Sequence, residues 1–317
     1  MTHEHWTSYW QTGVTGSFGA QEPKWYKEIL EPFWQDIFSS LPQKAEILDV
    51  ATGNGAIARI AALSSKNNDR EFSITASDKA RQKPAETNYD NGIKYLLNSP
   101  TENLEFPGHQ FDLITSQFGI EYSDIKKSLP TLFKHLKPGA ELIFIAHNSQ
   151  SIICNESREE LNQYRSILDE QPIFKKLDQL ITSMGEIRSR SDLAALKSNR
   201  SADKSREAFN RLVAKLTARY SEGIVIADLL KQINPIFKQM MMAPVSEKLK
   251  FSNTIKLNMQ QARLRLQDMV SAALDEKGVK QLLLLAENTG FECSEASKLE
   301  DDSTHLLAWK IRLKSAG

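Results

Sequence analysis

The sequence predicts an α/β protein whose mostly parallel sheet is interrupted by a large all-helical insertion. From Glu46 to Asn148, short apolar runs alternate with segments of helical spacing or turn residues. Residues 149–276 then show helical spacing and almost no strand-like run. Strand-like runs return only near the carboxyl terminus, which indicates an insertion into one sheet rather than a separate downstream domain.

Five apolar runs mark the expected strands of the first part of the sheet. They are ILDVA, FSITAS, IKYLL, FDLITS and ELIFIA. Unbroken apolar runs are typical of parallel strands, because helices cover both faces of such a sheet. Upstream of them, apolar residues at helical spacing after Pro23 predict a helix that Pro32 bends or interrupts.

The end of the chain supplies the remaining elements. The segment VKQLLLLAENTGFE predicts a helix that Gly290 closes at its C-cap. A short strand is expected around residues 291–297, and HLLAWKIRL predicts a last strand. The helical insertion before them contains about five expected helices.

These elements divide the chain into three expected parts. Residues 1–40 form an amino-terminal aromatic arm and helix, and residues 41–149 with 277–317 form the sheet domain. Residues 150–276 form the helical insertion, which serves as a substrate cap or as a dimerisation surface. A homodimer through this insertion is therefore one expected partner.

Composition narrows the classes of function. The 40 basic residues balance the 40 acidic ones, so no overall field holds the chain on nucleic acid or on an anionic membrane. No apolar run approaches the roughly 20 residues of a bilayer span, and the start lacks the pattern of a signal peptide. A cytoplasmic protein without a membrane partner is expected. Two distant cysteines, Cys154 and Cys293, favour reduced thiols over a disulfide or a metal cluster, and no metal site is predicted.

Positive charge is concentrated in the expected insertion. Residues 150–285 contain 22 basic and 16 acidic residues, and residues 188–219 contain nine basic residues against Asp192, Asp203 and Glu207. Such a stretch is either a solvated helix face or a surface that binds anions or RNA.

A glycine-containing turn, DVATGNG, follows the first expected strand. Gly53 and Gly55 permit a sharp turn and the close approach of a ligand to the backbone. The dinucleotide fingerprint would need a third glycine where Ala58 stands. The turn instead resembles the first motif of the class I S-adenosylmethionine (SAM)-dependent methyltransferases, which Asp49, Ala51 and the two glycines match.

Three further segments resemble the same family in the same order. FSITASDKA places Asp78 where the family has an acidic residue that accepts hydrogen bonds from both ribose hydroxyls, and capping of the next helix is the alternative role. SPTENLEFPGHQFDLITS resembles the adenine-binding loop and fourth strand. Pro100 stands there where many relatives carry an aspartate, and Ser99 or Glu102 are the candidates to replace it. LKPGAELIFIAHN resembles the turn into the fifth strand, with residues 137–139 as helix stop and turn.

The resemblance implies a Rossmann-like methyltransferase sheet with an antiparallel last strand. It also implies SAM as the cofactor and S-adenosylhomocysteine as the product. The residues expected at the cofactor are Trp10, Asp49, Ala51, Thr52, Gly53, Asn54, Gly55, Asp78, Lys79, Thr101, Glu102, Asn103, Ser116, Gln117 and Phe118.

Candidates for the chemistry follow the fourth and fifth strands, because ligands of parallel α/β sheets bind outside the carboxyl ends of the strands. These candidates are Glu121, Tyr122 and His147. Methyl transfer requires an aligned acceptor and, where the acceptor carries a proton, a group that receives it. Glu121 or His147 is expected to do so, and a helix-capping Glu121 and a structural His147 are the alternatives.

The expected function is methyl transfer to an O, N or S atom of a small molecule held under the helical cap. The first alternative is an RNA (tRNA) or protein methyltransferase that uses the basic stretch 188–219. The second is a SAM-binding protein without turnover, since a fold does not fix a function. The aromatic residues Trp6, Tyr9 and Trp10 either close over the cofactor or substrate, as a lid does, or pack against the sheet.

Overall fold

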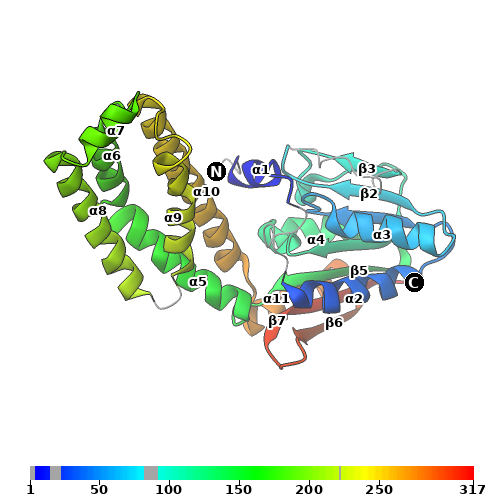
Figure 1. The fold of residues 1–317 in the computed structure, drawn as a ribbon. Helices are drawn as coiled ribbons and strands as arrows, with labels where there is room; N and C mark the ends of the chain where they lie inside the picture. The colour runs from blue at the N-terminus through cyan, green and yellow to red at the C-terminus, as the bar shows by residue number, and fades with distance from the viewer. Residues whose placement is uncertain (1–3, 15–22, 82–91, 221–222) are drawn as a thin grey trace. The chain divides into compact units, whose positions relative to one another are not determined.

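The computed structural model describes residues 4–14, 23–81, 92–220 and 223–317 (Figure 1). The chain divides into two compact units. Unit 1 comprises Met1–Asn155 and Asp268–Gly317, and unit 2 comprises Glu156–Gln267. Residues 150–155 and 268–276, which the sequence placed in the insertion, therefore belong to the sheet-containing unit.

Unit 1 is built on one seven-stranded sheet with the strand order β3-β2-β1-β4-β5-β7-β6 (Figure 1). Strand β7 pairs antiparallel with β5 and with β6, and all other pairs are parallel. This order confirms the predicted Rossmann-like sheet with an antiparallel last strand. The strands are β1 (Glu46–Val50), β2 (Ser73–Ser77), β3 (Ile93–Leu96), β4 (Phe111–Gln117), β5 (Leu136–His147), β6 (Phe291–Glu300) and β7 (Leu306–Ser315).

Helices cover both faces of the sheet, which explains the unbroken apolar runs of its strands. Successive side chains of β1 show the two faces: Ile47 belongs to the apolar cluster that contains Trp34, and Leu48 to the one that contains Leu129 and Leu282. The helices that contribute to these clusters are α2 (Glu31–Ser39) and α3 (Ala56–Asn67) on one face, and α4 (Ile125–Lys134) and α11 (Glu276–Thr289) on the other.

The helix predicted after Pro23 changes its winding at Pro32. A π-helix, η1 (Tyr26–Leu30), leads directly into α2, and Pro32 stands in the first turn of α2. Pro32 has no N–H group to donate to the preceding turn, and the change of winding falls next to it. The end of α11 is as predicted, because Gly290 caps it with a φ of +118°.

The predicted turn at residues 137–139 is wrong in one respect. The helix stop is confirmed, because α4 ends at Lys134, but β5 already begins at Leu136. Leu136 and Glu141 pair with Phe111 and Leu113 of β4, so four residues of β5 lie opposite one residue of β4. Gly139 has a φ of +74°, which permits this irregularity within the strand.

The two ends of the helical segment meet beside the sheet. Asn148 forms a parallel bridge with Leu274. The backbone N–H of Leu274 donates to the carbonyl of His147 at 2.8 Å, and its carbonyl accepts from the N–H of Ser149 at 2.9 Å and from Nε1 of Trp309 at 2.9 Å. This junction supports the interpretation that the helices are inserted between β5 and α11.

Unit 2 is helical over its described residues and has its own apolar core, which includes Leu177, Leu229 and Ile255. Over the described part of residues 150–276, six α-helices lie entirely within this range where about five were expected, and the seven-residue α7 is too short to give a clear period. They are α5 (Ile152–Arg165), α6 (Ile173–Met184), α7 (Arg190–Leu196), α8 (Arg200–Arg219), α9 (Ile224–Phe237) and α10 (Val245–Ala272). No helix of the described chain has the length and apolar character that a bilayer crossing requires.

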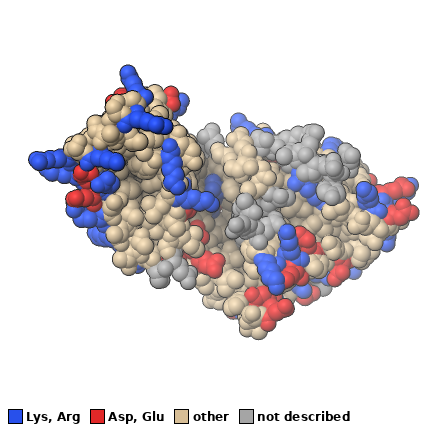
Figure 2. All heavy atoms as spheres, in the orientation of Figure 1, with Lys and Arg blue, Asp and Glu red and all other residues tan. Residues whose placement is uncertain are grey.

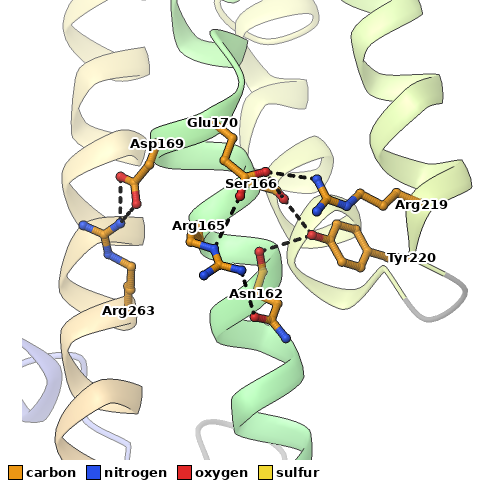
Figure 3. Close-up of polar contacts among 8 residues, drawn as sticks. All are labelled: Asn162, Arg165, Ser166, Asp169, Glu170, Arg219, Tyr220 and Arg263. Carbon is orange, nitrogen blue, oxygen red and sulfur yellow. Dashed lines mark hydrogen bonds and ion pairs between the residues drawn. The ribbon is translucent and has the colours of Figure 1, made fainter.

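Polar contacts hold a π-helix of unit 2, η4 (Ser166–Glu170), from two sides (Figure 3). Asp169 accepts two hydrogen bonds from Nη1 of Arg263, at 2.7 and 2.9 Å. Glu170 accepts one from Nη1 of Arg219 at 3.0 Å. The hydroxyls of Ser166 and Tyr220 lie 2.6 Å apart. The acids of η4 therefore neutralise arginines of α8 and α10.

Candidate active site

A cavity of about 360 Å³ lies in unit 1 at the carboxyl ends of β1, β2 and β4. Helix α1 (Glu4–Trp10) and the last turn of α10 complete its wall. A second cavity of about 30 Å³ lies at the glycine turn and shares Trp10, Ala51 and Phe118 with the first. The larger cavity is lined by Trp6, Trp10, Ala51, Asp78, Lys79, Ala80, Pro100, Thr101, Glu102, Phe118, Gly119, Glu121, Tyr122, Ser123, Asp268, Ser271 and Ala272.

The turn between β1 and α3 requires both of its glycines. Gly53 and Gly55 have φ values of +56° and +84°. A Cβ atom on Gly53 would lie 2.6 Å from Cζ2 of Trp10, and one on Gly55 would collide with the hydroxyl of Tyr95. The side chains of Trp10 and Tyr95 therefore approach the backbone of this turn more closely than a Cβ atom would permit.

Asp78 ties the glycine turn to the end of β2. Its Oδ2 accepts a hydrogen bond from the N–H of Gly53 at 2.7 Å, and its Oδ1 accepts one from the N–H of Ala80 at 2.7 Å. Burial raises the pKa of this carboxyl group. Each carboxylate oxygen accepts up to two hydrogen bonds, so the group retains acceptor capacity for two hydroxyl donors in the cavity. The side chain thus fits the ribose of SAM.

Two residues beside the cavity have backbone conformations that side chains disfavour. Ala51 follows β1 with a φ of +53°, and Phe118 follows β4 with a φ of +51°. Each such residue costs about 1–2 kcal/mol. The two turns touch, because a Cβ on Gly119 would lie 2.6 Å from that of Ala51. Strain of this kind concentrates at functional sites, and both residues line both cavities.

Asp49 stabilises the turn between β1 and α3 through hydrogen bonds. It is buried at the end of β1 and accepts hydrogen bonds from the hydroxyls of Thr52 and, at 2.9 Å, Thr115. Burial raises its pKa to about 7, and the two hydroxyls partly oppose this shift. Asp49 and Thr52 line only the smaller cavity.

Glu121 is a buried carboxyl group in the lining of the larger cavity. Its Oε1 accepts a hydrogen bond from the N–H of His147 at 2.9 Å, and its Oε2 has no hydrogen-bond partner among the described residues. Burial raises its pKa to about 7. The neighbouring Tyr122 has a pKa raised well above its ordinary value, again by burial, so its phenol remains a hydrogen-bond donor. The cavity therefore holds a proton acceptor that is effective near neutral pH beside a neutral donor.

His147, one of the predicted candidates for the chemistry, lines neither cavity. Its ring stacks on Phe118 with centroids 4.4 Å apart and lies edge-on to Tyr122 at 6.1 Å. Burial lowers its pKa to about 3, so the imidazole is neutral. His147 supports the ring of Phe118 from behind, and its backbone orients Glu121.

Most of the residues predicted at the cofactor line one of the two cavities. The exceptions are Asn54, Gly55, Asn103 and Ser116. Asn103 is exposed, and Gly55 acts through the shape of the turn. Ser116 donates to the carbonyl of Val50 at 2.9 Å, behind the cavity wall.

Asn54 and Gln117 have roles that the family motif does not indicate. The amide of Asn54 donates to the carbonyls of Trp10 at 3.0 Å and Val14 at 2.6 Å, so it anchors the segment after α1. Gln117, which lines the smaller cavity, accepts from Nε1 of Trp34 at 2.7 Å. Its amide also donates to the hydroxyl of Tyr26 at 2.9 Å.

Several wall residues were not found from the sequence. Asp268 is the clearest, because its Oδ2 lies 2.6 Å from Nε2 of His5 and accepts from Nε1 of Trp6 at 3.0 Å. Ser271, one helical turn later, also faces the cavity. The only sequence signal was their spacing by three residues, which places them on one helix face.

The structure shows the surroundings of Pro100, which stands where many relatives carry an aspartate that contacts the adenine. Pro100 and Glu102 line the cavity, whereas Ser99 does not. The hydroxyl of Ser99 donates instead to the carbonyl of Leu97 at 3.1 Å. Of the two predicted substitutes, the structure leaves Glu102 as the candidate.

The known proteins that this chain matches are methyltransferases. Residues 23–170 match the family model described as the ubiE/COQ5 methyltransferase family. The chain is 35% identical over 120 residues to a ubiquinone/menaquinone biosynthesis C-methyltransferase UbiE of Rickettsia bellii, covering 35% of this chain and 48% of that protein. It is 33% identical over 124 residues to the protein of the same name from Rickettsia felis, covering 36% and 50%. The chain thus spans about half the length of these curated relatives.

Solved structures are more distant. One is a S-adenosylmethionine-dependent methyltransferase from Mesorhizobium loti, with 21% identity and a TM-score of 0.30 over 38% of this chain and 55% of that one. Another is the phosphoethanolamine N-methyltransferase 2 of Haemonchus contortus in complex with SAM, with 13% identity and a TM-score of 0.39 over 100% and 58%.

Proposed function

We propose that this chain is a class I SAM-dependent methyltransferase that transfers the methyl group of SAM to a small apolar acceptor. One observation carries the proposal. Asp78 and Thr101, which match the family's cofactor motifs, face the same cavity as Glu121 and Tyr122. A cofactor and an acceptor bound in this cavity would therefore be adjacent.

The residues of the cavity fit the cofactor part by part. SAM supplies an electrophilic methyl group on a positively charged sulfur. The carboxylate of Asp78 would accept the ribose hydroxyls, and Thr101 and Glu102 would lie beside the adenine. Aromatic rings line the cavity, and by limiting the access of water they would strengthen these polar contacts.

The cavity wall favours a flat acceptor with an acidic proton. Trp6, Trp10, Phe118 and Tyr122 present aromatic surface, and Glu121 can take up a proton. Removing the proton of a ring hydroxyl makes both the oxygen and the neighbouring ring carbons more nucleophilic. The relatives are named as C-methyltransferases of quinone biosynthesis, so carbon joins O, N and S as a proposed acceptor atom.

An RNA substrate, which would use the basic stretch 188–219, has less support than a small-molecule acceptor. Four of the nine basic side chains of this stretch form ion pairs within unit 2. These pairs are Arg188–Glu186, Arg206–Asp203, Arg211–Glu207 and Arg219–Glu170. Much of the stretch therefore has the contacts of a solvated helix face.

A turnover assay tests the proposed function. The protein is incubated with SAM and an alkylated hydroquinone, an unmodified tRNA, or no acceptor, and S-adenosylhomocysteine is measured by mass spectrometry. We expect product with the hydroquinone alone. Product with tRNA and not with the hydroquinone would contradict the proposal. Cofactor binding without product from any acceptor would support a protein without turnover.

We further propose that α1 is a cover that moves when the cofactor binds. Trp6 lies edge-on to Tyr122 with centroids 5.5 Å apart, and Trp10 lies against Gly53. The cavity at the glycine turn holds only about one or two water molecules. A cofactor group that contacts Gly53 therefore requires the indole of Trp10 to move.

Replacing the Trp10 indole tests this cover. Trp10→Ala joins the two cavities, and we expect SAM to dissociate about tenfold faster, since lid contacts act mainly on the dissociation rate. Trp6→Phe is the comparison, because it keeps a ring beside Tyr122 and removes the hydrogen bond to Asp268. Stopped-flow fluorescence measures both rates. An unchanged rate in Trp10→Ala would show that α1 is a fixed wall.

A further inference from the structure

Unit 2 contains a large polar cavity of its own. Its volume is about 690 Å³, and α6, α8 and α10 provide the lining residues. The family match ends at residue 170, before the first of these helices begins. The methyl-transfer site in unit 1 uses none of the residues that line this cavity.

Hydrogen-bond donors without partners face this cavity. Lys175 of α6, Ser201 and Ser205 of α8, and Asn253 and Lys256 of α10 all line it. Their side chains make no hydrogen bond or ion pair with any other residue that the structure describes. Three helices therefore direct ammonium, hydroxyl and amide donors to one place, and nothing within the described chain uses them.

The charge of the lining favours an anion. Asp178 is its one carboxylate, and its Oδ1 already accepts a hydrogen bond from the buried hydroxyl of Ser252 at 2.8 Å. The two lysines leave the lining with a net charge of +1. Two arginines elsewhere in unit 2 differ from these lysines, because Arg219 and Arg263 form ion pairs with acidic residues of η4 (Figure 3).

The surrounding unit reinforces this preference. Unit 2 contains 20 basic and 13 acidic residues, a net charge of +7 in a chain whose total is zero. On the face shown in Figure 2, lysine and arginine side chains are spread over the helices of unit 2 with few acidic side chains among them. An anion that approaches the unit is thus attracted before it reaches the cavity.

We propose that this cavity binds the phosphate group of a small organic phosphate. Ammonium groups and neutral donors together satisfy phosphate oxygens, and charge-assisted hydrogen bonds are the strong ones. The ring of Phe174 lies in the same wall and offers apolar surface to the organic part. The volume falls within the range of sites for small molecules.

Isothermal titration of the full chain with inorganic pyrophosphate, with ribose 5-phosphate and with tRNA tests the proposal. We expect both small phosphates to bind with dissociation constants below about 1 mM. The double variant Lys175→Met and Lys256→Met is expected to weaken their binding about tenfold or more. Ser201→Ala with Ser205→Ala should weaken it by a smaller factor.

The matched control removes the same charge from the same unit. Lys238 and Lys250 are exposed and do not line the cavity, so Lys238→Met with Lys250→Met is expected to leave binding unchanged. Equal loss in the two double variants would overturn the proposal, because it would show general attraction only. Binding of tRNA without either small phosphate, or no binding of the small phosphates up to about 10 mM, would overturn it as well. The titration does not depend on methyl transfer, so its result is separate from that of the turnover assay.

Discussion

Asp78→Asn is expected to weaken the binding of S-adenosylhomocysteine about 100-fold, which is about 2.7 kcal/mol. The asparagine amide would place its N–H₂ against the N–H of Gly53 or that of Ala80, because both carboxylate oxygens accept a backbone hydrogen bond. It would also remove one of the two acceptors for the ribose hydroxyls. Hydrogen bonds to charged groups contribute about 1.5–3 kcal/mol each, which sets the size of the loss.

Isothermal titration calorimetry with the product nucleoside measures this effect. Asp36→Asn on the exposed face of α2 is the matched control, and its affinity should equal that of the natural chain. Equal affinities in both variants would show that the ribose does not bind at Asp78. Thermal unfolding followed by circular dichroism shows whether Asp78→Asn remains folded.

Glu121→Gln is expected to lower kcat by about 100- to 1,000-fold, the range of a lost general base. The change keeps the hydrogen bond from His147, because the glutamine carbonyl can replace Oε1, and it removes the proton acceptor. Binding of S-adenosylhomocysteine should change less than about threefold, since Glu121 belongs to the acceptor side of the proposed site. The exposed Glu292→Gln on β6 is the control, and its kcat should equal that of the natural chain.

The pH dependence of kcat gives an independent test of the role of Glu121. Glu121 can accept a proton only in its ionised form, and burial raises its pKa to about 7. The rate should therefore rise as the pH increases through about 7 and level off above it. Glu121→Gln should lack this rise. The same rise in the variant would assign the titration to another group, and an undiminished kcat would show that the acceptor needs no base.

The sequence predicted the parts of the molecule that local patterns specify. Buried parallel strands read as apolar runs, and a turn that needs positive φ values reads as glycine, so the sheet and the turn from Asp49 to Gly55 could be recognised. The residues at 137–139 misled the prediction, because proline and glycine usually mark a turn. The strand instead accommodates them at an irregularity in its pairing with β4.

The wall of the active site could not be predicted in the same way. Glu121 and His147 both stand where strands end, but only Glu121 lines the larger cavity, and the His147 ring stacks on Phe118. Asp268 reaches the site from the end of α10, far from every cofactor motif in the sequence. Such contacts depend on how distant segments meet, which a local period does not record. The seven-residue α7 is too short to show a helical period in the sequence.

The cavity beside Asp78 and Glu121 is the proposed SAM site. Titration of S-adenosylhomocysteine into the full chain tests it most directly, because this ligand binds without reacting. We expect one molecule per chain, a dissociation constant in the micromolar range, and a negative heat-capacity change from the aromatic surface that becomes buried. No binding up to about 1 mM would contradict it.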